Sequence, residues 1–214
     1  MKRVSFLLSL TLAPFFCTVD AQAQWRAGVV AGVNASFIDV ENSVPGEREG
    51  QRGLHLGLVV ERDLLPWLSL RAEPSYTSAG GRFAFGDAVF NGTKSRYALD
   101  YLALPVLSRA RVSRGPVSPI ASVGVSPAWL IRERTRVTDN SGRDDLYDSD
   151  QNYRSFNVGL LVEGGVDLRL PTGRPVMVGL TVRHERGLTS IQEVGVGSTS
   201  IRATSILAAL TVAI

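Results

Sequence analysis

The chain has 214 residues, of which 44% are hydrophobic, and carries 23 lysines and arginines against 20 aspartates and glutamates. This length suffices for one domain, and a formal net charge of only +3 argues against binding of nucleic acid by bulk electrostatics. After the N-terminal segment no apolar run is long enough for a membrane-spanning helix, and the 21 glycines fit an all-β chain.

The first 23 residues have the pattern of a secretory signal peptide. Two basic residues begin the chain, an apolar core follows over residues 4–16, and Ala-Gln-Ala at residues 21–23 offers a cleavage site. The apolar run is too short for a membrane anchor, and Cys17 follows Phe16 rather than the small residue that lipoprotein signals require. We therefore predict a signal peptide over residues 1–23 and one domain over residues 24–214, without cysteine.

Strand-like patterns recur along the predicted domain. In chain order they cover residues 25–36, 52–63, 67–79, 95–109, 117–132, 156–170, 175–186 and 200–214. Polar segments at 37–51, 80–94, 134–152 and 187–199 alternate with short turns near residues 65–66, 113–116 and 171–173. About eight strands with alternating long and short connections are typical of outer-membrane barrels, whose long loops lie outside the cell and whose tight turns lie in the periplasm.

The segment Phe156–Leu170 gives the clearest evidence for this fold. Side chains of a strand alternate between its two faces. One face would carry Val158, Leu160, Val162 and Val166, whereas the other would carry Glu163, Asp167 and Arg169. About ten residues of tilted strand cross a bilayer, with apolar side chains toward lipid and polar ones toward the lumen. We therefore predict an all-β, single-domain, antiparallel transmembrane β-barrel of about eight strands.

Aromatic residues gather near both ends of the predicted strands. Trp25 and Trp67 begin strands at the predicted periplasmic end. A second group falls near the extracellular end and consists of Tyr76, Tyr97, Trp129, Tyr153 and Phe156. Rings with a polar edge favour the headgroup region, so we predict two interfacial belts. The facing of residues 95–109 stays open, because Leu102 and Leu104 have the opposite parity to Tyr97 and Leu99, and a bulge could intervene.

Charged residues lie on the predicted lumen face of several strands. They are Glu61, Arg71, Glu73, Glu163, Asp167, Arg169, Arg183 and Glu185. The interior of an eight-stranded barrel is just wide enough to be filled by side chains. Buried charges must then pair, because an isolated one is very costly. We predict a structural network of paired charges rather than a water-filled, ion-selective lumen.

Four short stretches resemble the PorT-like family of outer membrane β-barrel domains. They are residues 70–80 (LRAEPSYTSAG), 99–107 (LDYLALPVL), 122–130 (SVGVSPAWL) and 183–191 (RHERGLTSI). The elements that carry the resemblance best are Glu73-x-x-Tyr76, the Tyr-Leu-x-Leu-Pro at residues 101–105 and the Gly-Leu-Thr at residues 187–189. The resemblance implies an eight-stranded barrel. Some members of that family belong to secretion and gliding machinery, and most have no assigned activity.

No catalytic, cofactor or metal site is expected from the sequence. The two histidines, His55 and His184, are predicted to face the lumen and the lipid side, so they do not converge on one site. We predict a monomeric, non-enzymatic barrel in the outer membrane that acts through its extracellular loops or within an envelope or secretion complex. A small passive pore is the alternative. Expected partners are outer-membrane lipid and other envelope proteins, but not nucleic acid. Arg132, Arg134 and Arg136 could meet lipopolysaccharide phosphates, and a solvated strand end explains them equally well.

Overall fold

The computed structural model describes residues 24–40, 47–84, 94–112, 115–138, 144–147, 154–172, 175–190 and 199–214. The predicted signal peptide and Tyr153 lie outside these residues. The described chain is all-β. Its strands are β1 (Trp25–Val40), β2 (Glu47–Leu65), β3 (Leu68–Ala72), β4 (Ser75–Ala84), β5 (Lys94–Ala103), β6 (Val106–Arg111), β7 (Val117–Thr138), β8 (Asp144–Tyr147), β9 (Phe156–Leu170), β10 (Val176–Gly187) and β11 (Thr199–Ala213).

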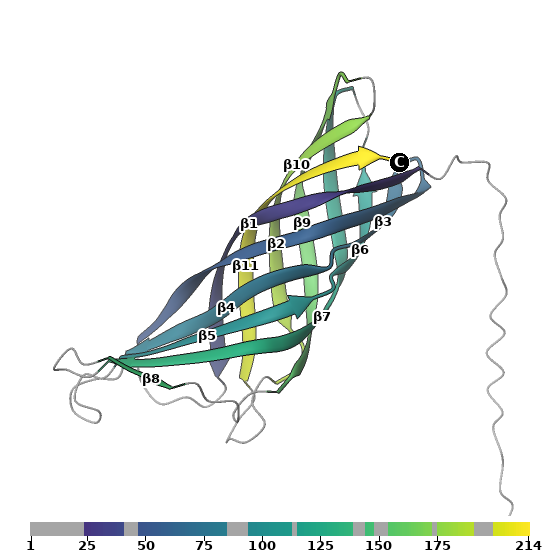
Figure 1. Ribbon diagram of the computed structural model, residues 1–214. Coiled ribbons are helices and arrows are strands. Elements are labelled where there is room, and N and C mark those ends of the chain that lie inside the picture. The colour runs from purple at the N-terminus through teal and green to yellow at the C-terminus, as the bar shows by residue number, and fades with distance from the viewer. Residues whose placement is uncertain are drawn as a thin grey trace, which may run out of the picture.

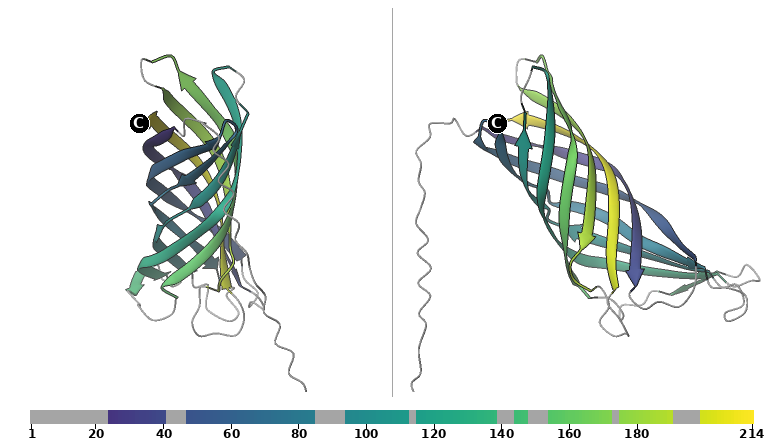
Figure 2. Two further views of the ribbon diagram at one scale, coloured as in Figure 1. Left: turned by 90° about the vertical axis from the view of Figure 1, so that its right-hand side faces the viewer. Right: turned by 180° about the vertical axis from the view of Figure 1, so that it is seen from behind.

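These strands form one antiparallel sheet that closes into a tilted barrel (Figures 1 and 2). Closure is shown by β1, which pairs with β2 on one side and with β11 on the other. From β11 the ring continues through β10, β9 and β7. It then passes through the crossing made of β5 and β6 and the crossing made of β3 and β4, and returns to β2. Within the described residues, no helix has the length and apolarity that a membrane crossing requires.

The eleven strands of the described chain correspond to eight crossings of the barrel wall. Two crossings are interrupted, β3–β4 at Pro74 and β5–β6 at Pro105, because proline has no N–H to donate to the ladder. Backbone bonds bridge both breaks, from Leu58 N to Pro74 O (3.0 Å) and from Glu73 N to Pro105 O (2.9 Å). The short β8 pairs only with β7, outside the closed ring. The predicted number of about eight strands therefore matches the eight crossings. The described chain has eleven strands because two crossings are interrupted and because β8 lies outside the ring.

Several strands are longer than the sequence pattern indicated. The predicted loops 37–51, 80–94 and 134–152 are shortened by extensions of β1, β2, β4 and β7, and the last also contains β8. β7 alone has 22 residues, about twice the length that a bilayer crossing needs. Beyond the membrane a strand needs no apolar face, so backbone pairing continues where the alternation ends. The extensions project at the loop end of the barrel, opposite the turn end where the C-terminus lies (Figure 1).

The facing of residues 95–109, which the sequence left open, is uniform in the structure. Leu99, Tyr101 and Leu107 are buried inside the barrel, whereas Leu102 and Leu104 are exposed outside. The break at Pro105 does not change this parity. A bulge does occur, but it lies on the neighbouring β7: Asp100 pairs with Arg132 and Tyr101 with Leu130, so Ile131 is the extra residue.

The outer surface is apolar over the middle of the barrel, and the inner surface is largely polar or charged. The exposed outer side chains include Val33, Leu56, Leu58, Val123, Val162, Leu180, Ile206 and Leu210. Among the predicted interfacial aromatics, Trp25 and Trp67 are exposed at the turn end, and Trp129 and Phe156 pack together toward the loop end with ring centroids 5.3 Å apart. An apolar exterior around a charged interior is stable in lipid and would be unstable in water.

Two of the predicted belt residues are placed differently from Trp129 and Phe156. Tyr97 packs against the apolar cluster inside the barrel, because it shares the inward parity of Leu99 and Tyr101, so its assignment to the outer belt is wrong. Tyr76 is on the outer side but is half-buried.

Changing Val162 to arginine tests the facing directly. Val162 is 50% exposed on the outer face of β9, and Val162→Arg should lower the free energy of unfolding in lipid by about 2–4 kcal/mol. Val117→Arg makes the same change at the turn-end start of β7 and should cost about 0–1 kcal/mol, because the penalty falls near the membrane interface. Both are measured by urea titration of the barrel refolded into lipid vesicles. Equal losses would contradict the assigned position of the lipid band.

Candidate functional site: a charge network in the lumen

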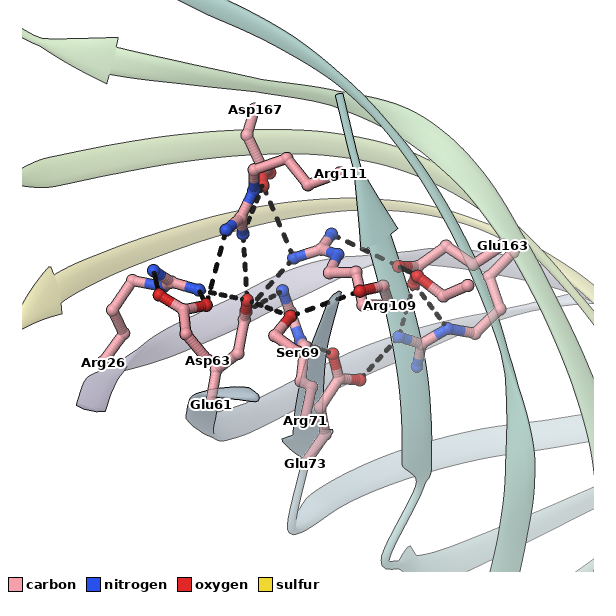
Figure 3. A network of polar contacts seen from close by, with 12 residues as sticks. Arg26, Glu61, Asp63, Ser69, Arg71, Glu73, Arg109, Arg111, Glu163 and Asp167 are labelled. Carbon is pink, nitrogen blue, oxygen red and sulfur yellow. Dashed lines mark hydrogen bonds and ion pairs between the residues drawn. The ribbon is translucent and has the colours of Figure 1, made fainter. Parts of the chain in front are cut away.

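The lumen toward the turn end is filled by a network of buried ion pairs (Figure 3). Neighbouring strands place opposite charges in direct register: Arg26 on β1 lies opposite Glu61 on β2, which lies opposite Arg71 on β3. On the other side Glu163 of β9 lies opposite Arg183 of β10. On these two parts of the wall, inward-pointing charges of opposite sign therefore follow from strand parity and pairing.

Glu61 is the centre of this network. Its side chain is 1% exposed and contacts four arginines. Arg26 Nη2 is 2.6 Å from Glu61 Oε1 and Arg111 Nη2 is 2.9 Å from the same oxygen. Arg109 Nη1 approaches Oε2 at 3.4 Å, and Arg71 Nη1 at 3.8 Å. The hydroxyl of Ser69 also donates to Glu61 Oε1 at 2.8 Å. One carboxylate thus receives contacts from β1, β3 and β6.

A second carboxylate, Glu163, connects the far wall of the barrel. Arg183 donates from Nε and Nη2 to Glu163 Oε2 at 3.0 and 2.6 Å, a two-pronged contact. Arg109 Nη2 lies 3.3 Å from Glu163 Oε1, and Ser122 donates to the same oxygen at 3.1 Å. Arg183 also lies 2.6 Å from Glu73 Oε2. Arg109 therefore bridges Glu61 and Glu163 across the lumen, as Figure 3 shows.

The remaining contacts complete a balanced set. Arg111 pairs with Asp167 at 3.0 Å, Arg26 pairs with Asp63, and Arg71 pairs with Glu73. The network contains five arginines, Arg26, Arg71, Arg109, Arg111 and Arg183, and five carboxylates, Glu61, Asp63, Glu73, Glu163 and Asp167. Equal numbers of both signs leave the buried set neutral, which reduces the desolvation penalty that unpaired charges would carry.

Six of the eight lumen charges named from the sequence lie in this network, and two do not. Arg169 has the lumen parity but is exposed, because it follows Asp167 at the turn-end rim, beyond the last layer of paired charges. Glu185 is half-buried and lines a cavity of about 40 Å³ on the loop-end side of the network. The recorded ion pairs between described residues do not include Glu185.

Sequence reasoning missed Arg26, Asp63, Arg109 and Arg111. Arg26 and Asp63 lie an even number of residues from inward-facing side chains of their own strands. Extending the alternation to the strand ends would therefore have placed both in the lumen. Arg109 and Arg111 lie on β6, whose facing the pattern did not settle.

The loop-end half of the lumen has a different character. It contains an apolar cluster formed by Ile38, Ala79, Leu99, Tyr101, Ala103, Ala128 and Ile201. The adjoining cavity of about 40 Å³ is large enough for one water molecule. His55 lines this cavity and is buried, with no hydrogen-bond partner for its Nε2 among the described residues. The lumen is therefore filled by paired charges in one half, and in the other by apolar side chains together with buried polar ones such as Asn34, Glu133 and Asn157.

His184 lies on the outer face, away from His55. Its Nδ1 is 3.1 Å from the hydroxyl of Thr204 on β11. The register places Val162 on its other side, so neither cross-strand neighbour supplies the carboxylate of a hydrolytic triad. Among the described residues, no group of three or more histidine, aspartate or glutamate side chains could hold a metal ion.

The comparisons with known proteins agree with this architecture. The family model described as outer membrane protein beta-barrel domain matches residues 20–193. The chain belongs to this family. It is an integral protein of the outer membrane. No curated protein sequence gives a significant match.

One solved structure supports the fold at low sequence identity, and two others match less closely. The outer membrane protein OprG from Pseudomonas aeruginosa is 13% identical, with 90% of this chain and 96% of that chain covered and a TM-score of 0.55. Neisserial surface protein A is 15% identical over 87% of this chain and 96% of that chain, with a TM-score of 0.48. The outer membrane enzyme PagL is 16% identical over 83% of this chain and 97% of that chain, with a TM-score of 0.35. At 13% identity the likeness to OprG concerns the fold alone.

Removing the central carboxylate tests the network. Glu61→Gln should lower the free energy of unfolding by about 3–5 kcal/mol, because four arginines would lose a shared buried anion. Glu49→Gln is the control. Glu49 is exposed on β2, and its carboxylate lies 3.8 Å from the exposed Arg82. Losing this surface ion pair should change stability far less. Urea unfolding in the same vesicles measures both. A Glu61→Gln barrel as stable as Glu49→Gln would contradict a dry, coupled network.

Proposed function

We propose that this chain is a non-conducting, non-enzymatic outer-membrane barrel that acts from its extracellular side or as part of an envelope complex. One observation carries the proposal: the balanced network of five arginines and five carboxylates occupies the lumen that a pore would need. An eight-crossing barrel has room for side chains but not also for a water column. Mutual neutralisation means that these charges need no mobile ions.

The long strands support an extracellular role. β2, β4, β5 and β7 continue beyond the apolar band at the loop end, and β8 adds to this projection (Figures 1 and 2). A protein that served only to cross the membrane would not need 22-residue strands. Loops and sheet edges carried on a rigid barrel are suited to contacts with other molecules. We also propose that the chain groups with the PorT-like members of its family, on the basis of the four sequence stretches above.

Single-channel recording tests the sealed lumen. The refolded protein should give no steady openings in a planar bilayer, because the network excludes a continuous water path. Glu163→Ala should lower stability by roughly 3–5 kcal/mol, since Arg109 and Arg183 lose a partner, without producing a selective channel. Steady ion-selective openings of the unmodified barrel, with a selectivity that Glu163→Ala changes, would refute the sealed barrel and favour the passive pore.

A further inference from the structure

The outer face of the projecting sheet carries a row of arginines in direct register. Arg82 on β4 lies opposite Arg96 on β5, and Arg96 lies opposite Arg136 on β7. All three side chains are exposed. Like charges directly opposite one another on neighbouring strands destabilise a sheet. Glu49 lies 3.8 Å from Arg82 and offsets part of this repulsion. An anion beside Arg96 and Arg136 would offset more of it.

A hollow lies beside this row. Its lining includes two small residues, Ser78 and Ala98, and otherwise consists of Gln51, Arg52, Arg96, Arg134 and Arg136. The hollow measures about 210 Å³, which is enough for a phosphate group. Short side chains among long cationic ones create a recess whose walls are basic.

Two of the arginines are held in position by neighbouring polar groups. Arg96 Nε donates to Gln51 Oε1 at 3.2 Å, and Arg134 Nη2 donates to Asp100 Oδ2 at 2.9 Å. Each contact uses part of a guanidinium that has five N–H donors, so other donors of the same group stay available. Asp100 is buried and compensates Arg134. Arginine forks match the geometry of phosphate oxygens, so the hollow favours a phosphate over a simple halide ion.

The height of the hollow identifies the source of the phosphate. On β5 and β7 the exposed Leu102 and Trp129 are paired at the edge of the apolar band. Ala98 lies four residues further along β5, about 13 Å of strand toward the loop end. A tilted strand at that distance from the interfacial tryptophan reaches the headgroups of the outer leaflet. On the far side of the barrel Arg186 lies opposite Arg202, and both are exposed.

We propose that this hollow, lined by Arg52, Arg96, Arg134 and Arg136, binds a phosphate group of the phosphorylated glycolipid of the outer leaflet. The inference deepens the proposed extracellular role, on which it rests, by naming the partner of the projecting sheet. It does not depend on a sealed lumen, because the hollow is on the opposite face of the wall from the charge network. The bound phosphate offsets the repulsion within the arginine row and anchors the projection against the membrane.

Lipid binding by the full mature barrel is the first test. The protein in non-ionic detergent is titrated with bisphosphorylated lipid A and with its dephosphorylated form, and adducts are counted by native mass spectrometry. The phosphorylated form should bind more tightly, and Arg96→Gln combined with Arg136→Gln should weaken it at least tenfold, because charge-assisted contacts are lost. Arg169→Gln, which removes an exposed charge at the turn end, should have no effect.

Three results would overturn the proposal. They are equal binding of the two lipid forms, unchanged binding by the double variant, or an equal loss in Arg169→Gln. Inorganic phosphate that binds as tightly as the lipid would refute the headgroup as the source. Conductance is recorded on the same preparations. A barrel that conducts ions but still binds the phosphorylated lipid would refute the sealed lumen and support the lipid site.

A stability comparison separates binding from a structural role. In lipid-free detergent the double variant should unfold at the same or a higher urea concentration than the unmodified protein, because like-charge repulsion is removed. In vesicles containing bisphosphorylated lipid A the order should reverse. Arg52→Gln, which changes the hollow outside the arginine row, should be as stable as the unmodified protein in detergent and less stable in the lipid A vesicles. A variant barrel that is less stable in both media would mean that these arginines support the fold rather than a ligand.

Discussion

The structure depends on burying one carboxylate, Glu61, in a barrel interior too narrow for bulk water. An isolated charge there would be very costly, so the strands around Glu61 must supply compensating cations. They do so from β1, β3 and β6, through Arg26, Arg71 and the pair Arg109 and Arg111. Arg109 then requires its second partner, Glu163 on β9. The network therefore links crossings that are not neighbours in the sheet.

Such a network is not by itself a source of great stability. A buried ion pair often contributes no more than well-packed apolar groups of the same volume, whereas breaking it is costly. Its consequence here is specificity: a strand shifted by one residue would turn its charges toward lipid and its leucines toward the lumen. The lumen charges and the apolar exterior thus impose the same register. Neither constraint acts on the strands that project beyond the membrane, so that part of the molecule can serve a function other than crossing the membrane.

Much of this arrangement could be predicted from the alternation of residues. Parity along Phe156–Leu170 places Glu163 and Asp167 inside and Val162 outside, as the structure does. Alternation fails where lipid no longer enforces it. Strand pairing continues into the loop-end extensions, which the alternation did not predict, and Arg169 lies past the last buried layer. The pairing of Arg109 with both Glu61 and Glu163 depends on distances across the lumen, which strand patterns do not contain.

The central claim is that the lumen charges act as one neutral unit, and a double-mutant cycle measures this most directly. Glu61→Gln, Arg111→Gln and the double variant are unfolded by urea in the same vesicles; the two side chains are 2.9 Å apart. The double variant restores equal numbers of positive and negative charges, so its loss of stability should be smaller than the sum of the single losses by at least about 1 kcal/mol. Losses that simply add would show that the two charges are screened from each other, and a hydrated lumen would follow.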